Sequence, residues 1–183
     1  MSRSIPPGGP VEEPPPPDRF DPARILQTLD RHGVRYVLIG GLAATLQGSA
    51  VATFDLALAP EQSRENHRRL AAALTEVGAV RTTDPDAPMT TPSADDFVYL
   101  VESFVSPIGY VDVFREAQAV GGFDQLTRRA NHIDVAGVEI LVADLADIIA
   151  SKEAADRPKD RAQLPLLYAL RDERKGEGPE KNR

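Results

Sequence analysis

The sequence predicts an α/β (α+β) fold in which helices flank one mixed β-sheet and two helices form a pair at the C-terminal end. Segments with helical periodicity alternate with short runs of β-branched and aromatic residues, as in α/β proteins. Several neighbouring strand segments are joined by connections too short for a crossover helix, so those strands must be antiparallel. The last two helical segments each begin with a start signal, Asp144 and Pro158.

Four elements are expected in the first third of the chain. A helix is expected over 21–33 because Asp21 is suited to cap it, Pro22 to occupy its first turn and Gly33 to end it. The next elements are a strand over 34–40 (VRYVLIG), a short helix between Gly41 and Gly48, and a strand over 52–58 (ATFDLAL).

The remaining elements continue the alternation. A long helix is expected over 59–78, with Pro60 near its start. Residues 132–143 are typical of a hairpin that turns at Ala136–Gly137. The other expected elements are a short strand over 79–83, a polar loop over 84–96, strands over 97–103 and 109–116, a short helix over 121–130, and helices over 144–157 and 158–173.

We expect one domain over residues 21–172 with a tail at each end. The chain has 183 residues, and eight of its 16 prolines lie at or before Pro22. Proline fixes φ and removes a backbone donor, so residues 1–20 are expected to form a disordered or polyproline-like tail, with an SH3-type ligand as the alternative. Residues 173–183 are charged and poor in apolar side chains, which predicts a second disordered tail.

Composition excludes several classes of protein. The absence of cysteine excludes disulfides and thiolate metal sites, and the three histidines lie too far apart in the sequence to predict a zinc site. The formal net charge is −7, so any nucleic-acid contact needs a local basic patch. No apolar run approaches the roughly 20 residues of a membrane span. The N-terminus also lacks the apolar core of a signal peptide, so we expect a cytoplasmic protein with no membrane partner.

Gly40 and Gly41 lie between an expected strand and an expected helix, and Ser49 follows that helix. Glycines let a backbone approach a phosphate closely, and a helix N-terminus adds partial positive charge. A serine hydroxyl can donate a further hydrogen bond. These residues predict a phosphate cradle or, alternatively, only a turn between a strand and a helix.

Asp55 and Asp112 each lie within an apolar strand segment, where a lone carboxylate is costly to bury. Alternation places Asp55 on one face with Thr53 and Ala57, and Asp112 on one face of its own strand. On neighbouring strands the two carboxylates would converge, and convergent carboxylates bind Mg²⁺ together with substrate phosphates. The alternative is a pair of exposed strand aspartates.

The third candidate is the segment SKEAADRPKD, where two predicted helices meet. Lys152 and Asp156 lie four residues apart and are expected to pair. Arg157 and Lys159 add positive charge suited to a triphosphate or an RNA backbone, the alternative being a solvated helix face. Asp160 is expected to favour the dipole of the last helix.

Taken in order, the stretches YVLIGGLAATLQGSAVATFDLAL, GYVDVF and DLADIIASKEAADRPKDRAQLPLL resemble the AbiEii/MenT-like nucleotidyltransferase toxins of bacterial toxin–antitoxin systems, within the DNA polymerase β-like superfamily. The resemblance covers roughly residues 22–172. It implies a nucleotidyltransferase-like mixed sheet and transfer of a nucleoside monophosphate from a nucleoside triphosphate to tRNA or protein, blocked by a cognate antitoxin. Asp55 and Asp112 would then bind Mg²⁺ and serve catalysis. The implied nucleotide-binding residues are Gly40, Gly41, Ser49, Lys152, Arg157 and Lys159.

The chain departs from the family pattern at two positions. Ala57 stands where the family has the second acid of a pair, and Val51 stands in a region where the family often has arginine. Loss of a metal ligand removes charge stabilisation in the transition state. Three hypotheses follow: an active Mg²⁺-dependent nucleotidyltransferase, a catalytically degenerate relative that binds nucleotide or a partner, and a structural protein without a ligand.

Overall fold

The computed structural model describes residues 20–50, 53–82 and 89–176. The predicted tails therefore lie outside the described residues over 1–19 and 177–183, as does Val51. Within the described ranges, none of the helices is both long and apolar enough to cross a membrane.

One seven-stranded mixed sheet forms the centre of the molecule, with strand order β3-β4-β5-β2-β1-β7-β6. The β1–β7 and β2–β5 pairs are parallel, and the other neighbouring pairs are antiparallel. The predicted mixed sheet is thus confirmed. The strands are β1 (Tyr36–Ile39), β2 (Asp55–Pro60), β3 (Val80–Arg81), β4 (Val101–Ser106), β5 (Gly109–Phe114), β6 (Asn131–Val135) and β7 (Val138–Val142).

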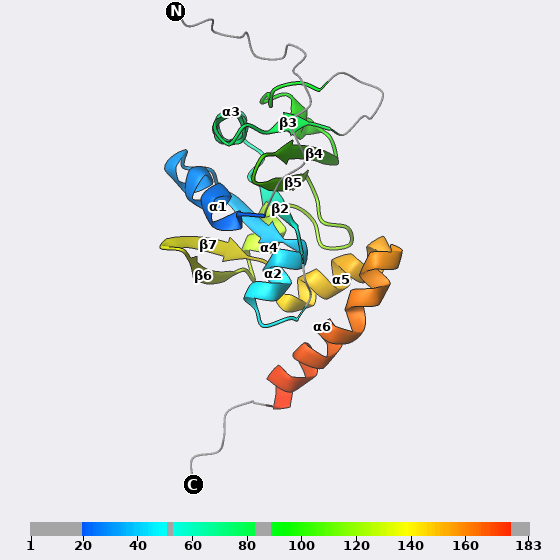
Figure 1. Cartoon of the computed structure of the whole chain (residues 1–183). Helices are drawn as coiled ribbons and strands as arrows, with labels where there is room; N and C mark the ends of the chain where they lie inside the picture. Colours follow the sequence, from blue (N-terminus) through cyan, green and yellow to red (C-terminus); the bar gives the residue numbers. More distant parts are fainter. Residues whose placement is uncertain (1–19, 51–52, 83–88, 177–183) are drawn as a thin grey trace, which may run out of the picture.

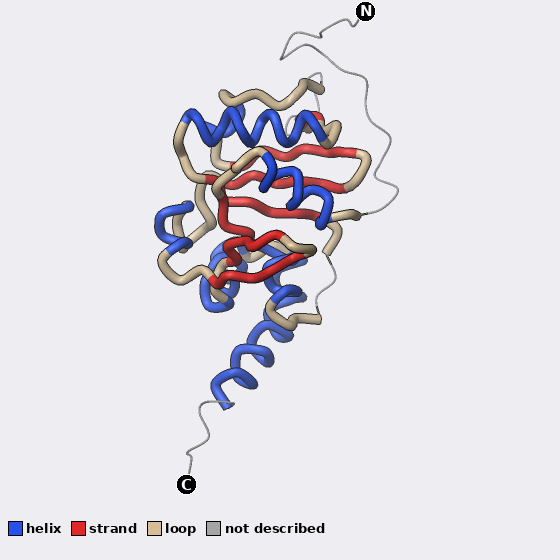
Figure 2. The backbone as a smooth tube through the Cα atoms, turned by 90° about the vertical axis from the view of Figure 1, so that its left-hand side faces the viewer, coloured by secondary structure: helices blue, strands red, loops and turns tan. Residues whose placement is uncertain are grey.

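Helices flank this sheet, with α1 and α3 on one side and the C-terminal pair α5 and α6 on the other (Figure 1). The tube view shows α1 and α3 running across the face of the sheet that is turned to the viewer (Figure 2). Buried leucine and isoleucine side chains of α1 and α3 join the strands in one core. The helices are α1 (Pro22–Arg31), α2 (Gly40–Leu46), α3 (Arg64–Glu76), α4 (Phe123–Thr127), α5 (Leu145–Ala155) and α6 (Pro158–Gly176), with a 3₁₀ turn at Asp96–Val98.

Local signals set several element boundaries as predicted. The Asp21 side chain accepts a hydrogen bond from the backbone N–H of Arg24, and the Asp144 side chain accepts one from Ala146. Such N-cap bonds satisfy backbone donors that the first helical turn leaves open. The β6–β7 hairpin turns at Ala136 and Gly137, which both have positive φ, as a two-residue hairpin loop requires.

Several boundaries differ from the prediction, two of them because tertiary pairing overrides the local pattern. Pro60 ends β2 opposite Tyr36, and α3 begins only at Arg64, where the Ser63 side chain caps it. The strand expected over 97–103 begins at Val101, because β4 takes its register from the tight hairpin that joins it to β5. At the other end of the chain, α6 continues to Gly176, four residues beyond 172.

Candidate functional site

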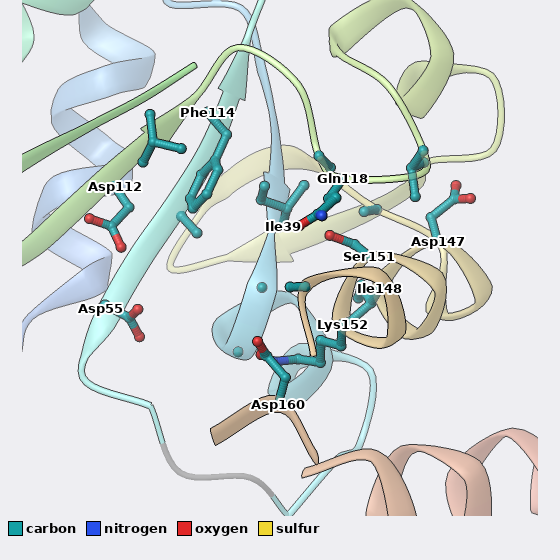
Figure 3. A pocket seen from close by; sticks show the side chains of 18 of the residues that line it. Ile39, Asp55, Asp112, Phe114, Gln118, Asp147, Ile148, Ser151, Lys152 and Asp160 are labelled. Atoms are coloured by element: carbon teal, nitrogen blue, oxygen red, sulfur yellow. The ribbon is translucent and has the colours of Figure 1, made fainter. Parts of the chain in front are cut away.

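A cleft of about 1030 Å³ lies between the sheet and the C-terminal helices. It is lined from β2, β5, the start of α2, the loop after β5 and the α5–α6 junction (Figure 3). Of the predicted site residues, those that line it are Gly40, Gly41, Asp55, Asp112, Lys152, Arg157 and Lys159. Ser49 is buried, its backbone N–H donates to the Ala44 carbonyl, and it is not among the described residues that line the cleft.

Asp55 and Asp112 come together because β2 and β5 pair in parallel. In this register Asp55 lies beside Tyr110, and Asp112 lies beside Ala57, so both acids project from the same face. The close-up shows the two carboxylates directed into the same space (Figure 3). The pairing of β2 with β5 therefore brings the two acids together on one face, as the alternation predicts.

Neutral hydroxyl groups hold both carboxylates in place. Thr53 Oγ1 donates to Asp55 Oδ1 at 2.5 Å, and Ser103 Oγ donates to Asp112 Oδ1 at 2.7 Å. Burial raises the pKa of Asp112, the hydrogen bond from Ser103 lowers it, and the negative charge of Asp55 raises it further, with a net upward shift. The negative charges of the two acids therefore repel each other, and a bound cation would reduce this repulsion.

Gly40 and Gly41 are required by the packing of α2 against β2. Gly40 has a φ of +74°, and a Cβ atom there would lie 3.1 Å from the Cβ of Ala57. A Cβ atom on Gly41 would lie 2.7 Å from Thr53 Oγ1, closer than such atoms approach. Both glycines therefore allow the backbone to approach the acid-bearing strand, and both also line the cleft.

The α5–α6 junction contains a charge cluster around Asp160, which is fully buried. Lys152 Nζ donates to Asp160 Oδ1 at 3.0 Å and to Gln163 Oε1 at 2.5 Å. Arg157 Nε donates to Asp160 Oδ2 at 2.6 Å. Although burial raises the pKa of Asp160, the hydrogen bonds from Arg157 and Lys152 lower it overall.

The predicted pairing of Lys152 with Asp156 is wrong. Helix α5 ends at Ala155, and Asp156 takes a left-handed conformation with a φ of 47°. The helical spacing that would bring the two side chains together is therefore broken, and Asp156 pairs instead with Arg161 at 3.1 Å. Lys152 turns to Asp160 across the junction.

Sequence reasoning missed the role of Asp160 and of Gln163. The spacing of Arg157 and Asp160, three residues apart at the start of a helix, was an available signal for their ion pair. The contact from Lys152 depends on how α6 packs against α5. Asp147, which is buried, ion-paired with Arg129 and part of the cleft lining, was also missed.

Asp55 and Asp112 are the convergent carboxylates that would hold a Mg²⁺ ion in the cleft. Within the described ranges, no group of three or more histidine, cysteine, aspartate or glutamate side chains is arranged to hold a metal ion. Mg²⁺ is usually bound through one or two carboxylates with water and substrate phosphates, which Asp55 and Asp112 can provide. A second ion beside this pair would need a further carboxylate there, and Ala57, which lies opposite Asp112, has none.

Comparisons with solved structures identify the class of fold. No protein-family model and no curated protein sequence matches the chain significantly. The chain is similar to the lincosamide antibiotic adenylyltransferase LnuA, solved with lincomycin bound, at a TM-score of 0.56 and 14% identity over 80% of this chain and 93% of that one. It is also similar to the antibiotic-resistance factor ANT(2'')-Ia, solved with adenylyl-2''-tobramycin, at a TM-score of 0.52 and 15% identity over 84% of this chain and 94% of that one.

The solution structure of ANT(2'')-Ia gives the same TM-score of 0.52, at 14% identity. This chain therefore has the fold of nucleotidyltransferases. That result confirms the predicted fold class.

Proposed function

We propose that this protein transfers a nucleoside monophosphate from a nucleoside triphosphate to an acceptor, with one Mg²⁺ held by Asp55 and Asp112. The observation that carries the proposal is the convergence of these two carboxylates in a cleft whose other wall supplies Lys159. Nucleotidyl transfer needs anionic ligands for a cation close to positive charge for the phosphates. The nucleotidyltransferase fold supports the same function.

The three cations of the α5–α6 junction would have different roles in nucleotide binding. Lys159 is exposed beside the cleft, and its charge acts on Asp112, so it is suited to contact the phosphates. Arg157 lines the cleft while bound to Asp160 through Nε, and its other guanidinium nitrogens can reach a phosphate. Lys152 is committed to Asp160 and Gln163, so its part is to hold the junction.

A bound Mg²⁺ would neutralise phosphate charge and stabilise the departing pyrophosphate. The backbone at Gly40 and Gly41 borders the same space and would limit how deeply the phosphates enter. The Thr53 and Ser103 hydroxyls would keep the two carboxylates oriented while the nucleotide exchanges. Ser49 has no part in this proposal because it does not line the cleft.

Two likenesses point to two classes of acceptor. The sequence resemblance extends the proposal to tRNA or protein acceptors and to a toxin controlled by a cognate antitoxin. The fold neighbours were solved with lincomycin and with adenylyl-2''-tobramycin, which extends the proposal to hydroxylated small molecules. Both classes would present a nucleophilic hydroxyl to the α-phosphate.

The proposal is tested by incubating the full chain with each of four α-labelled nucleoside triphosphates, Mg²⁺, and either bulk tRNA, a protein extract or small hydroxylated compounds. We expect label transfer from one or more nucleotides, falling about 100-fold or more in Asp55→Asn. The matched control is Asp172→Asn, which changes an exposed aspartate on α6 outside the cleft and should leave transfer intact. No transfer, or transfer unaffected by Asp55→Asn, would refute the proposal.

A second function is favoured by Ala57 and by the neutralised cations of the α5–α6 junction. On this proposal the protein is a catalytically degenerate relative that binds nucleotide or a partner without efficient turnover. Equilibrium dialysis would then detect nucleotide binding to the unmodified chain, and Ala57→Asp would be required for label transfer. Efficient turnover by the unmodified chain would exclude this second function.

A further inference from the structure

The walls of the cleft differ sharply in charge. Within the described part of the chain, every lysine or arginine that lines the cleft belongs to the α5–α6 junction: Lys152, Arg157 and Lys159. Large apolar side chains line the cleft instead around β4, β5 and the residue before β2. We call these residues the apolar wall, which consists of Phe54, Leu100, Val101 and Tyr110.

The apolar wall is exposed to an extent that is unusual for such residues. Phe54 and Leu100 are 71% and 70% exposed, and Val101 and Tyr110 are also classed with the exposed side chains. Single exposed apolar residues are common, but several that border one cleft mark a surface used for binding. The apolar wall is therefore suited to bind an apolar group of a ligand.

The wall lies directly beside the two acids. Phe54 precedes Asp55 in the chain, and Tyr110 shares a strand face with Asp112. Phe114 continues this face two residues beyond Asp112, and its ring lies above the cleft (Figure 3). A molecule resting on the wall would bring its nearest polar group close to the metal-binding acids.

Charge decides which kind of molecule suits this wall. The acidic residues that line the cleft from the strands and from the loop after β5 are Asp55, Asp112 and Glu116. An RNA backbone is held by lysine and arginine, and among the described residues none that lines this side of the cleft is either. Arg115, which follows Phe114, does not line the cleft and donates to the Val98 carbonyl. An acidic and apolar surface favours an acceptor that is neutral or cationic and has a flat apolar body.

We propose that the apolar wall is the acceptor subsite, and that the acceptor is a small neutral or cationic hydroxyl compound with an apolar ring, distinct from RNA. This inference rests on the proposed nucleotidyl transfer. In the step, the acceptor oxygen bonds to the α-phosphorus and the bond from the α-phosphorus to the bridging oxygen breaks. Pyrophosphate leaves, and the hydroxyl proton passes to solvent.

The test measures binding without nucleotide, so that it is independent of turnover. The two probes are 4-nitrophenyl glucoside and methyl glucoside, which share sugar hydroxyls and differ in the flat apolar ring. Saturation-transfer NMR on the full chain should show transfer to the ring protons, and the ring-bearing probe should bind about ten-fold more tightly than the methyl glucoside. Leu100→Asn should abolish most of that difference, while Leu100→Met should retain it.

The matched control is Leu166→Asn, which changes a leucine that is 49% exposed on α6 and does not line the cleft. Equal binding of the two probes, no signal from the ring, or equal weakening by Leu100→Asn and Leu166→Asn would overturn the inference. So would competition by bulk tRNA that Leu100→Asn relieves, because the wall would then hold RNA.

Failure of this inference can be distinguished from failure of the proposed function. Ring binding that depends on Leu100, without any label transfer, would leave the subsite standing and reject the transferase. Label transfer to tRNA or to a ring-free acceptor that is unaffected by Leu100→Asn would support the transferase and reject the acceptor subsite.

Discussion

The cleft contains two groups of acids that differ in the source of their counter-charge. Asp160 is fully buried and accepts hydrogen bonds from the cations of Lys152 and Arg157. Asp55 and Asp112 accept theirs from neutral hydroxyls. An acid that accepts hydrogen bonds from cations within the fold belongs to the scaffold, whereas a pair whose hydrogen bonds come from hydroxyls is suited to an external cation.

The largest effect on stability should come from removing Asp160, whose counter-charge is supplied by Lys152 and Arg157. Asp160→Ala leaves the ammonium of Lys152 buried without its carboxylate, and we expect a loss of roughly 3 kcal/mol in the free energy of unfolding. Arg157 is half exposed and would return to solvent at little cost. Urea denaturation monitored by circular dichroism measures the loss.

The control for this effect is the double variant Lys152→Met with Asp160→Leu, which removes both buried charges. It should recover most of the lost stability, because an apolar pair of similar volume can replace a buried ion pair. A single Asp160→Ala variant as stable as the parent would show that the junction does not depend on this acid.

The second effect concerns Asp55 and Asp112, the two acids that would share a bound cation. If Mg²⁺ binds between Asp55 and Asp112, adding it at about 100 times its Kd should raise the free energy of unfolding by about 2.7 kcal/mol. Asp112→Asn should lose this gain, while Asp172→Asn should keep it. Thermal unfolding with and without Mg²⁺ measures the difference. An equal gain in Asp112→Asn would place the ion elsewhere.

The pH dependence of stability should have opposite signs for the two groups, with effects of the order of 1 kcal/mol. The pKa of Asp112 is raised on folding, so its folded form retains a proton more readily. The free energy of unfolding should therefore fall as pH rises from about 3.9, the ordinary aspartate pKa, through the raised value. The pKa of Asp160 is lowered, so its stabilisation is present above the ordinary value and is lost as pH falls through the lowered one.

Urea denaturation across this pH range, with Asp112→Asn and Asp160→Asn as separate variants, resolves the two signs. The fall in stability with rising pH should disappear in Asp112→Asn alone. The loss of stability in acid should be reduced in Asp160→Asn alone. If the two substitutions changed the pH dependence of stability in the same direction, Asp112 and Asp160 would not differ as proposed.

The smallest effect should come from removing one neutral donor. Ser103→Ala deletes the hydrogen bond to Asp112 Oδ1, which lowers the pKa of this carboxyl, so the pKa should rise further. The accompanying loss of stability should be about 1 kcal/mol or less. Carboxyl ¹³C NMR titration measures the pKa of Asp112, and an unchanged value would show that Ser103 does not tune it.

Several features of the site were accessible from sequence because they depend on local periodicity. Alternation along a strand decides the face of Asp55 and of Asp112, and each prediction needs only a few neighbouring residues. Gly40 and Gly41 were accessible for a similar reason, since a glycine pair between a strand and a helix indicates close backbone approach. The caps at Asp21 and Asp144 are local signals of the same kind.

Other features depended on contacts between distant segments. The i, i+4 rule pointed Lys152 to Asp156, but α5 ends before that pair can form. Ser49 follows the glycines in sequence, yet the turn after α2 leaves it outside the cleft lining. The strand expected from residue 97 starts at Val101, because only residues opposite β5 have a pairing partner.

By itself, the sequence determined the element types, the mixed sheet and the strand faces of Asp55 and Asp112, because short-range sterics and alternation govern these properties. The tertiary structure alone decided that β2 and β5 are parallel neighbours, that Lys152 meets Asp160 and that the apolar wall borders the acids. These properties depend on strand register and helix packing, which join residues far apart in the chain. Such contacts leave no periodic signal in a single sequence.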